Sequence, residues 1–296
     1  MRILLIGKNG QVGWELQRTL MPLGEIISTD YPETDLADFD GTRNLIRNLQ
    51  PQVIVNAAAY TAVDQAESEP ELAFEVNSAA PGVLAEEARA VGALLIHYST
   101  DYVFDGEKGS PYTEDDVPDP INTYGASKLA GEKAVQQVDG AYLILRTSWV
   151  YSLRSDSFVT KVLAWAQQQR ALRIVTDQVA SPTWCRLLAE VTAQVLAAAG
   201  HTPKEWLEER KGLYHLTGAG HASRFEFTRT IMENLPPGDA NRAVEILPAS
   251  SDEFPSPARR PRNSSLDISK FENTFGMDIP AWEVSLRQAL EDHYQQ

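Results

Sequence analysis

Short aliphatic runs alternate with longer helical patterns over the first half of this 296-residue chain, and that alternation leaves few folds open. It is typical of repeated βαβ units, which build a parallel sheet. Each run is almost continuously apolar, as expected of strands covered on both faces. We expect strands at Arg2 to Ile6, Ile26 to Thr29, Val53 to Asn56, Leu94 to Ser99 and Tyr142 to Arg146, and helices at Gln11 to Met21, Thr42 to Leu49, Ala73 to Val91 and Tyr124 to Gln137.

Three glycines, Gly7, Gly10 and Gly13, follow the first predicted strand and open the first predicted helix. Such a turn lets a pyrophosphate approach the backbone and the positive end of the helix, so the loop predicts a dinucleotide site. Asp30, at the end of the second strand, can accept hydrogen bonds from an adenosine ribose and favours NAD over NADP. The alternatives are helix-capping glycines and an aspartate in an ordinary turn.

A run of small side chains follows the third predicted strand. The candidate cofactor contacts in it are Ala58, Ala59, Tyr60 and Thr61. Small residues at a strand end let a cofactor lie flat across the edge of the sheet. Helical alanines are the alternative, but the β-branched run before this segment and Pro70 after it favour a loop.

These signals predict an α/β fold: a Rossmann-type, doubly wound parallel sheet with a smaller C-terminal substrate-binding lobe. We expect residues 1–150 to form the NAD(P)-binding domain. Residues 151–296 should form mainly the substrate lobe, with segments at about 170–200 returning to the first domain. Helices of this half are expected at Phe158 to Gln169, Leu187 to Ala199 and Arg224 to Asn234.

Thr100 follows the fourth predicted strand, and Tyr124 and Lys128 open the helix after it. Residues four apart share one helical face, so we expect the ammonium near the phenol. A tyrosine ordinarily has a pKa of about 10, and a neighbouring cation favours its phenolate. Tyr124 is therefore the predicted proton donor, with Lys128 lowering its pKa and Thr100 holding the substrate oxygen. A chance Tyr and Lys on an exposed helix is the alternative.

Composition excludes several classes of function. Lys and Arg total 26 against 41 Asp and Glu, and the net charge of -15 repels nucleic acid and anionic lipid. The apolar run at the N-terminus is too short to span a membrane, and a single cysteine, Cys185, cannot form an internal disulfide. We therefore expect a cytoplasmic protein without nucleic acid or membrane partners. No Cys and His cluster has metal-ligand spacing, so no metal ligand is predicted.

Taken in order, the motifs resemble those of the extended short-chain dehydrogenase/reductases, and the likeness spans nearly the whole chain. The blocks that carry it are Gly7 to Gly13, Asn56 to Asp64, Ser99 to Gly106, Tyr124 with Lys128, Arg146 to Tyr151, Asp177 to Thr183 and Pro257 to Pro261. The resemblance implies a reductase that transfers hydride from NADPH or NADH to C4 of a keto sugar carried on a nucleotide.

The resemblance also implies residue roles. Those of the cofactor site are Gln11, Val12, Asp30, Asp35, Leu36, Ala59 to Thr61, Tyr124 and Lys128, and those facing the sugar are Thr100, Asp101, Tyr102 and Trp149. The face of Trp149 suits the apolar side of a pyranose, with a core tryptophan as the alternative. Arg259 and Arg260 stand between prolines and suit a diphosphate, with an exposed salt-bridged loop as the alternative.

The same resemblance bears on magnesium binding and on oligomeric state. In some relatives Mg²⁺ is linked to a dimer contact where Glu15 gathers with acids of later helices. Arg186 stands in the segment where one of those acids is expected, which argues against metal-bridged dimerisation. Monomer and homodimer both stay open. Members of the family use NADH and NADPH, so the preference argued from Asp30 is weak.

Two other functions are weighed against the reductase. An epimerase or dehydratase of the same superfamily returns the hydride to the sugar, but Thr100-Asp101-Tyr102 lacks the Asp-Glu pair that dehydratases place after this threonine. A non-catalytic regulatory subunit, such as that of methionine adenosyltransferase, has a related fold. The intact Thr100, Tyr124 and Lys128 argue against that function.

Overall fold

The computed structural model of the chain describes residues 1–200, 203–236, 238–239 and 244–295. Its centre is a six-stranded sheet in the order β10-β5-β4-β3-β1-β2, and every pairing in it is parallel. The strands are β1 (Arg2–Ile6), β2 (Glu25–Thr29), β3 (Val53–Asn56), β4 (Leu94–Thr100), β5 (Tyr142–Thr147) and β10 (Gly212–His215). The α/β fold with a parallel central sheet is confirmed, as are the five strands predicted in the first half.

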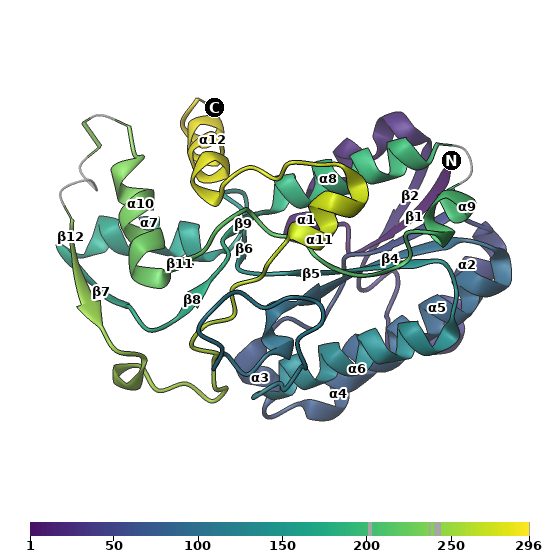
Figure 1. Cartoon of the computed structure of the whole chain (residues 1–296), viewed down its shortest axis with the longest axis horizontal. Helices are drawn as coiled ribbons and strands as arrows, with labels where there is room; N and C mark the ends of the chain where they lie inside the picture. Colours follow the sequence, from purple (N-terminus) through teal and green to yellow (C-terminus); the bar gives the residue numbers. More distant parts are fainter. Residues whose placement is uncertain (201–202, 237, 240–243, 296) are drawn as a thin grey trace.

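Helices cover both faces of this sheet, as Figure 1 shows. The helices α1 (Gln11–Thr19), α8 (Cys185–Ala199) and α11 (Ser269–Phe275) lie on one face, where Leu5, Leu16 and Leu188 share a core. The helices α2 (Phe39–Leu49), α5 (Ala80–Val91) and α6 (Thr123–Val138) lie on the other, where Leu4 and Ile46 are buried. Because successive strand residues point to opposite faces, two covered faces require the continuous apolar runs seen in the sequence.

One predicted helix, Ala73 to Val91, is wrong as a single element. The chain forms α4 (Pro70–Phe74), then a π-helical turn, η2 (Glu75–Ala79), and only then α5. Pro81 has no backbone N–H to donate to the carbonyl of Asn77, four residues earlier, so a regular α-helix loses one bond there. A π-turn at such a point is one of the ways in which a helix changes phase.

The strand β10 was not predicted. It comes from the second half of the chain, beyond α9 (Pro203–Glu208), and joins the sheet beside β5. Its four residues begin with Gly212, and no long apolar run marks them. The helix α8 also leaves the second half to pack on α1. Of the segment at about 170–200, α8 thus contacts the first half, whereas the strands before it lie in the second lobe.

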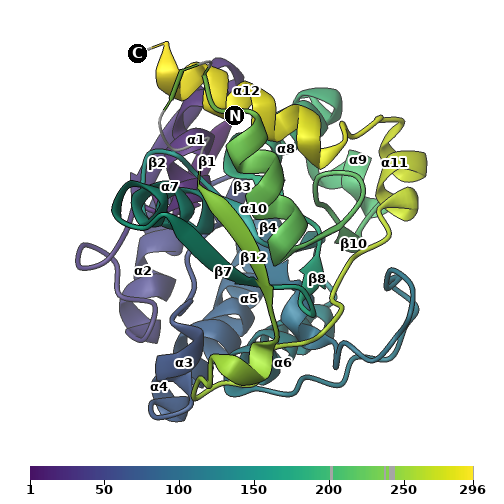
Figure 2. The ribbon, with the colours of Figure 1, turned by 90° about the vertical axis from the view of Figure 1, so that its left-hand side faces the viewer.

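The second lobe is built around three helices and a two-stranded parallel sheet, and Figures 1 and 2 show it beyond the carboxyl ends of the central strands. Its parts are α7 (Phe158–Gln168), α10 (Arg224–Glu233), α12 (Trp282–Tyr294), β7 (Ala171–Val175), β12 (Glu245–Ala249), and the short pairs β6 (Val150–Tyr151) with β9 (Thr183–Trp184) and β8 (Val179–Ala180) with β11 (Ala222–Ser223). Tyr151, Phe227 and Trp282 fill its core. None of the described helices combines the length and the apolar character that crossing a membrane requires.

Candidate active site

The glycine loop lies between the end of β1 and α1 and is shaped by close backbone approach. A Cβ on Gly13 would fall 1.8 Å from the carbonyl oxygen of Gly7, so no larger residue fits. Gly7 itself has φ +94°, and its N–H donates to the Thr29 carbonyl at 2.9 Å. Gly10 caps α1 without a side-chain hydrogen bond, so no capping side chain occupies the first N–H groups of the helix. A helix start of this kind suits an anion.

The loop after β2 lies beside the glycine loop. Asp30 accepts hydrogen bonds from the backbone N–H groups of Asn9 and Tyr31, each at 2.8 Å, so its carboxylate is fixed beside the glycine turn. The ammonium of Lys8 pairs with Glu33 at 2.5 Å, which brings a cation to this loop that sequence spacing did not suggest. Asp35 is exposed and accepts from Ala37, whereas Leu36 is buried in the core under α2.

The loop after β3 is held by a residue of the π-turn. Asn77 accepts from the N–H of Tyr60 at 2.8 Å and donates to its carbonyl at 3.0 Å, so it bonds the loop as a second strand would. Its amide also donates to Ser127 on α6 at 3.0 Å. The Tyr60 hydroxyl turns away to Glu69, and Thr61 is exposed. Asn77 was missed because nothing in the sequence marks a π-turn except Pro81.

Thr100 ends β4 and begins the turn η3 (Asp101–Val103). Its hydroxyl accepts from the N–H of Tyr102 and donates to Asp101 at 3.1 Å. Asp101 is 2% exposed and also accepts from Ser148 at 2.8 Å and Ser264 at 2.5 Å. Burial raises the pKa of Asp101 to about 6. The carboxylate therefore organises hydroxyl groups from both halves of the chain.

Tyr124 stands in the first turn of α6, beside Thr100. Asn122 caps this helix by accepting from Gly125, and a Cβ on Gly125 would collide with the Tyr102 carbonyl at 2.1 Å. That close approach places Tyr124 near Thr100, whose hydroxyl acts on the phenol. Burial raises the pKa of Tyr124 above its ordinary value. At neutral pH the phenol keeps its proton.

The side chain of Lys128 reaches from α6 down to β4. Its ammonium nitrogen donates to the Tyr98 carbonyl at 2.7 Å and lies 3.4 Å from Nε2 of His97, both on β4. Burial lowers the pKa of Lys128 to about 8. Burial governs the pKa of Tyr124 and Lys128 is not among the groups that shift it, so the assistance of Lys128 to the phenol stays a prediction.

The second lobe contributes an arginine that sequence reasoning missed. The guanidinium of Arg224, at the start of α10, lies 3.5 Å from the ring centre of Trp149 and 4.4 Å from that of Phe158. Among the described residues no carboxylate pairs with it, and burial lowers its pKa to about 10. Trp149 holds φ +39°, a left-handed conformation rare for a bulky residue. An unpaired guanidinium against aromatic faces is suited to an anionic ligand.

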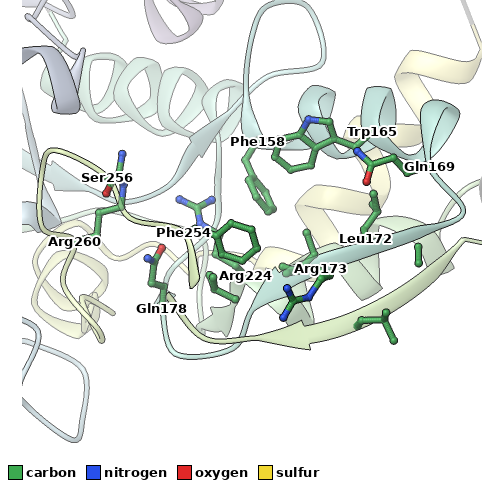
Figure 3. A pocket seen from close by; sticks show the side chains of 14 residues that line it. Phe158, Trp165, Gln169, Leu172, Arg173, Gln178, Arg224, Phe254, Ser256 and Arg260 are labelled. Carbon is green, nitrogen blue, oxygen red and sulfur yellow. The ribbon is translucent and has the colours of Figure 1, made fainter. Parts of the chain in front are cut away.

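A cavity of about 760 Å³ opens beside Arg224, between α7 and the β7–β12 sheet (Figure 3). Aromatic and apolar side chains form most of its wall, with Arg224, Arg260 and Gln178 at one end. Its lining residues are Phe158, Trp165, Gln169, Ala171, Leu172, Arg173, Ile174, Val175, Gln178, Arg224, Leu247, Phe254, Ser256 and Arg260. Apart from Arg260, no sequence signal marked them, because an apolar helix face and a short strand look alike in a core and in a pocket.

Arg259 and Arg260, in the loop between prolines, lie in different environments. Arg260 lines the cavity and pairs with Asp64 at 2.8 Å. Arg259 is exposed and does not line it, and its carbonyl accepts from Asn122 at 2.8 Å. The backbone of this loop therefore braces the start of α6, while a single guanidinium of the pair faces the cavity.

Comparison with known proteins places the chain. A family model described as the RmlD substrate binding domain matches residues 1–295. The chain belongs to this family. A dTDP-4-dehydrorhamnose reductase of Escherichia coli (strain K12) is 42% identical over 297 residues, which cover 99% of this chain and 98% of that protein. The resemblance inferred from the motifs is confirmed.

Two solved structures of reductases with the same name agree with the family assignment. The structure from Clostridium acetobutylicum has a TM-score of 0.90 at 35% identity and covers 100% of both chains. The structure from Bacillus anthracis, a complex with NADP, has a TM-score of 0.89 at 34% identity and covers 98% of this chain and 99% of that one. The likeness therefore includes both lobes.

Three acids surround Arg186 in this member of the family. Its guanidinium pairs with Asp292 at 2.5 Å and with Glu15 at 3.5 Å. Burial raises the pKa of Glu190, and the nearby Arg186 partly offsets that rise. Within the described part of the chain no group of three or more His, Cys, Asp or Glu is arranged to hold a metal ion. Cys185 beside it is buried, and burial raises the pKa of its thiol to about 12.

Proposed function

We propose that the chain reduces dTDP-4-dehydro-L-rhamnose to dTDP-L-rhamnose with NADPH or NADH, as the last step of dTDP-rhamnose synthesis. The names of its full-length relatives support this reaction. So does the NADP complex of the Bacillus anthracis reductase. A third support is the site itself, where Tyr124 lies near Thr100, and Asp101 and Tyr102 beside them lie close enough to Arg224 of the cavity wall to act on its pKa.

The observation that carries the proposal is the nearness of Tyr124 to Thr100 at the carboxyl end of β4. Two neighbouring hydroxyl groups can hold one carbonyl oxygen between them. The raised pKa of Tyr124 suits the reductive direction, because a phenol that keeps its proton at neutral pH can give it to the alkoxide formed at C4. Thr100 orients that oxygen, and Asp101 holds Thr100.

The cofactor site fits the Gly7 to Gly13 loop, whose lack of side chains leaves the α1 N-terminus open to a pyrophosphate. Asp30 and Asp35 would flank the adenosine, and the loop held by Asn77 would line the nicotinamide side. When bound, the dinucleotide supplies hydride. The chain's own residues orient the ketone and deliver the proton.

For the substrate we propose that the sugar lies beside Thr100, Tyr124 and Trp149, the diphosphate between Arg224 and Arg260, and the thymine in the 760 Å³ cavity. The uncompensated charge of Arg224 and its position on the Trp149 ring support this placement. The proposed division of labour follows: residues 1–150 bind the cofactor, and residues 151–296 mainly bind the substrate, with α8 and β10 completing the first lobe.

The test is turnover of dTDP-4-dehydro-L-rhamnose with NADPH or NADH, measured by loss of nicotinamide absorbance and by product analysis. Tyr124→Phe should lower kcat by roughly 10²- to 10⁴-fold, because the proton donor is gone. Tyr142→Phe, on β5 and outside the site, is the matched control. Equal rates for wild type and Tyr124→Phe would overturn the proposal.

A panel of dTDP- and UDP-linked 4-keto sugars then defines the substrate. Stoichiometric NAD retained on purification, with no net cofactor oxidation, would favour an epimerase instead. We also propose a cytoplasmic site of action, supported by a lone buried cysteine in the sequence.

A further inference from the structure

A carboxylate from the first half of the chain holds a loop from the second half. Asp64 lies in α3 (Val63–Ala66), directly after the loop that follows β3, whereas the loop of residues 256–260 lies beyond β12. Oδ1 of Asp64 accepts from the backbone N–H of Ala258 at 3.2 Å, and Oδ2 accepts from the Arg260 guanidinium at 2.8 Å. Both oxygens of one side chain are therefore bonded to the 256–260 loop.

Hydrogen bonds inside the 256–260 loop also direct Arg260. The guanidinium donates to the Ser256 hydroxyl at 2.6 Å and to the Ala258 carbonyl at 3.2 Å, and the Ser256 hydroxyl donates to the same carbonyl at 2.9 Å. Ser256 and Arg260 lie together at one end of the cavity (Figure 3). These bonds fix the guanidinium relative to its own loop, and Asp64 fixes the loop relative to the first lobe.

Arg260 and Arg224 approach the same phenol. Burial and the neighbouring Asp101 raise the pKa of Tyr102, and the two guanidinium groups partly offset that rise. Tyr102 in turn lies against Tyr124, with ring centres 5.9 Å apart and ring planes at 78°. The position of Arg260 therefore affects how the arginine end of the cavity lies relative to the predicted proton donor.

The pair of Asp64 and Arg260 is partly open to solvent. The Arg260 hydrogen bond lowers the pKa of Asp64, so the carboxylate is charged at neutral pH. The side chain of Asp64 is 44% exposed and that of Arg260 is 26% exposed, so solvent screens the pair and its contribution to stability is small. A guanidinium carries several N–H donors, so Arg260 can bind a second anion beside this carboxylate.

We propose that Asp64 is a positioning residue for the substrate, because its carboxylate holds the 256–260 loop, and with it the guanidinium of Arg260, at the diphosphate end of the cavity. This inference rests on the placement of the diphosphate in the proposed function. It adds that the first lobe, in which we place the cofactor, also sets the geometry of the diphosphate site in the second lobe.

The experiment is calorimetric titration of the full chain with dTDP, without cofactor. An amide has a single accepting oxygen and turns its NH₂ group toward the second donor, so Asp64→Asn cannot hold both the Ala258 N–H and the guanidinium. We expect Asp64→Asn to raise the Kd for dTDP about tenfold, as for the loss of one charge-assisted hydrogen bond to the ligand.

Asp116→Asn is the matched control, because Asp116 makes the same kinds of bond away from the cavity. Its carboxylate pairs with Lys108 at 2.5 Å and accepts from the backbone N–H of Thr113 at 2.6 Å, and it does not line the cavity. Denaturant unfolding should show similar small losses of stability in the two variants. Asp116→Asn should leave the Kd for dTDP unchanged.

A double-mutant cycle shows whether Asp64 acts through Arg260. Arg260→Met alone should weaken dTDP binding at least as much as Asp64→Asn does, and adding Asp64→Asn to it should cause a further loss of about twofold or less. Additive losses would mean that Asp64 acts independently of Arg260, and would overturn the inference. Unchanged or tighter binding by Asp64→Asn would overturn it as well, since the carboxylate would then be idle or would compete with the ligand for the guanidinium.

In the reductase assay Asp64→Asn should raise the KM for the dTDP-linked keto sugar and leave kcat and the KM for NADPH near their wild-type values, a split that a loosened fold would not give. Because the titration needs neither cofactor nor turnover, the two proposals can fail separately. A chain that binds dTDP with the expected dependence on Asp64 but reduces no keto sugar would defeat the proposed function and leave this inference standing. Turnover unaffected by Asp64→Asn would defeat this inference alone, and a wild-type chain that binds no dTDP would defeat both.

Discussion

The buried charged side chains near Thr100, namely Asp101, Glu132 and Arg146, form one cluster. This cluster and the cavity of the second lobe differ in how their charged side chains are paired. In the cluster every charged group has a protein partner: Glu132 holds Arg146, and Asp101 accepts from three hydroxyl groups. In the cavity Arg224 lies on aromatic rings and, among the described residues, has no carboxylate. A matched charge holds a scaffold in one arrangement, whereas an unmatched charge keeps its binding capacity for a ligand.

The largest effect that this contrast predicts is on stability in the cluster. Glu132→Gln leaves Arg146 buried without a counter-charge and should lower the free energy of unfolding by about 3–5 kcal/mol. Denaturant unfolding measures it. The exposed pair of Arg2 and Glu25 gives the control, since Glu25→Gln should cost about 1 kcal/mol or less. Equal losses in the two variants would mean that burial of the pair does not matter.

Asp101 should make the free energy of unfolding depend on pH. Its pKa is raised by burial from 3.8 to about 6, so the folded state binds the proton more tightly than the unfolded chain does. The stability from this group is full below about pH 4 and is lost as the pH rises through about 6. Asp101→Asn cannot ionise, so its free energy of unfolding relative to wild type should gain about 2–3 kcal/mol between pH 4 and pH 7. A constant difference across that range would contradict this account.

Substitution of Arg224 should have the reverse effects: a large loss of ligand binding and little change in stability. Arg224→Met removes charge-assisted hydrogen bonds to a diphosphate, which weakens dTDP binding by about 2 kcal/mol, or roughly 30-fold in Kd. The free energy of unfolding should not fall, because burial penalises this charge. Calorimetric titration with dTDP measures the first and thermal unfolding the second. Arg259→Met is the matched control, and an equal loss there would return the exposed arginine to the site.

The smallest effect is expected beside Asp30, at the proposed adenosine end of the cofactor site. Glu33 neutralises Lys8 on the surface. Glu33→Gln frees the ammonium for a 2′-phosphate and should raise the preference for NADPH over NADH about twofold to fivefold. Lys8→Met should shift the ratio the other way. Fluorescence titration of each variant gives its Kd values for NADPH and NADH, and the ratio of the two values tests this prediction.

What the sequence could predict depended on how local each signal was. The strands β1, β3, β4 and β5 were readable because both faces are buried, and β2 because its half-buried Ile26 and Ile27 pack on two cores. Thr100 and Tyr124 were readable because a strand end and a helix start are local features. The strand β10 could not be predicted, because no long apolar run marks it. The cavity wall could not be predicted either, because β7 pairs with β12 across more than sixty residues and neither sequence indicates its partner. The direction of Lys128 depends on a carbonyl of another strand, which helical spacing does not encode.

The return of the chain to the first lobe has a practical consequence for dissection of this protein. A fragment ending at residue 150 would keep the glycine loop and Tyr124 but would leave β5 as an open edge, with the row of N–H and C=O groups that β10 satisfies. It would also bare the apolar surface that α8 covers. The first 150 residues are therefore no transplantable module, and chimaeras between relatives should exchange α8 and β10 together with them.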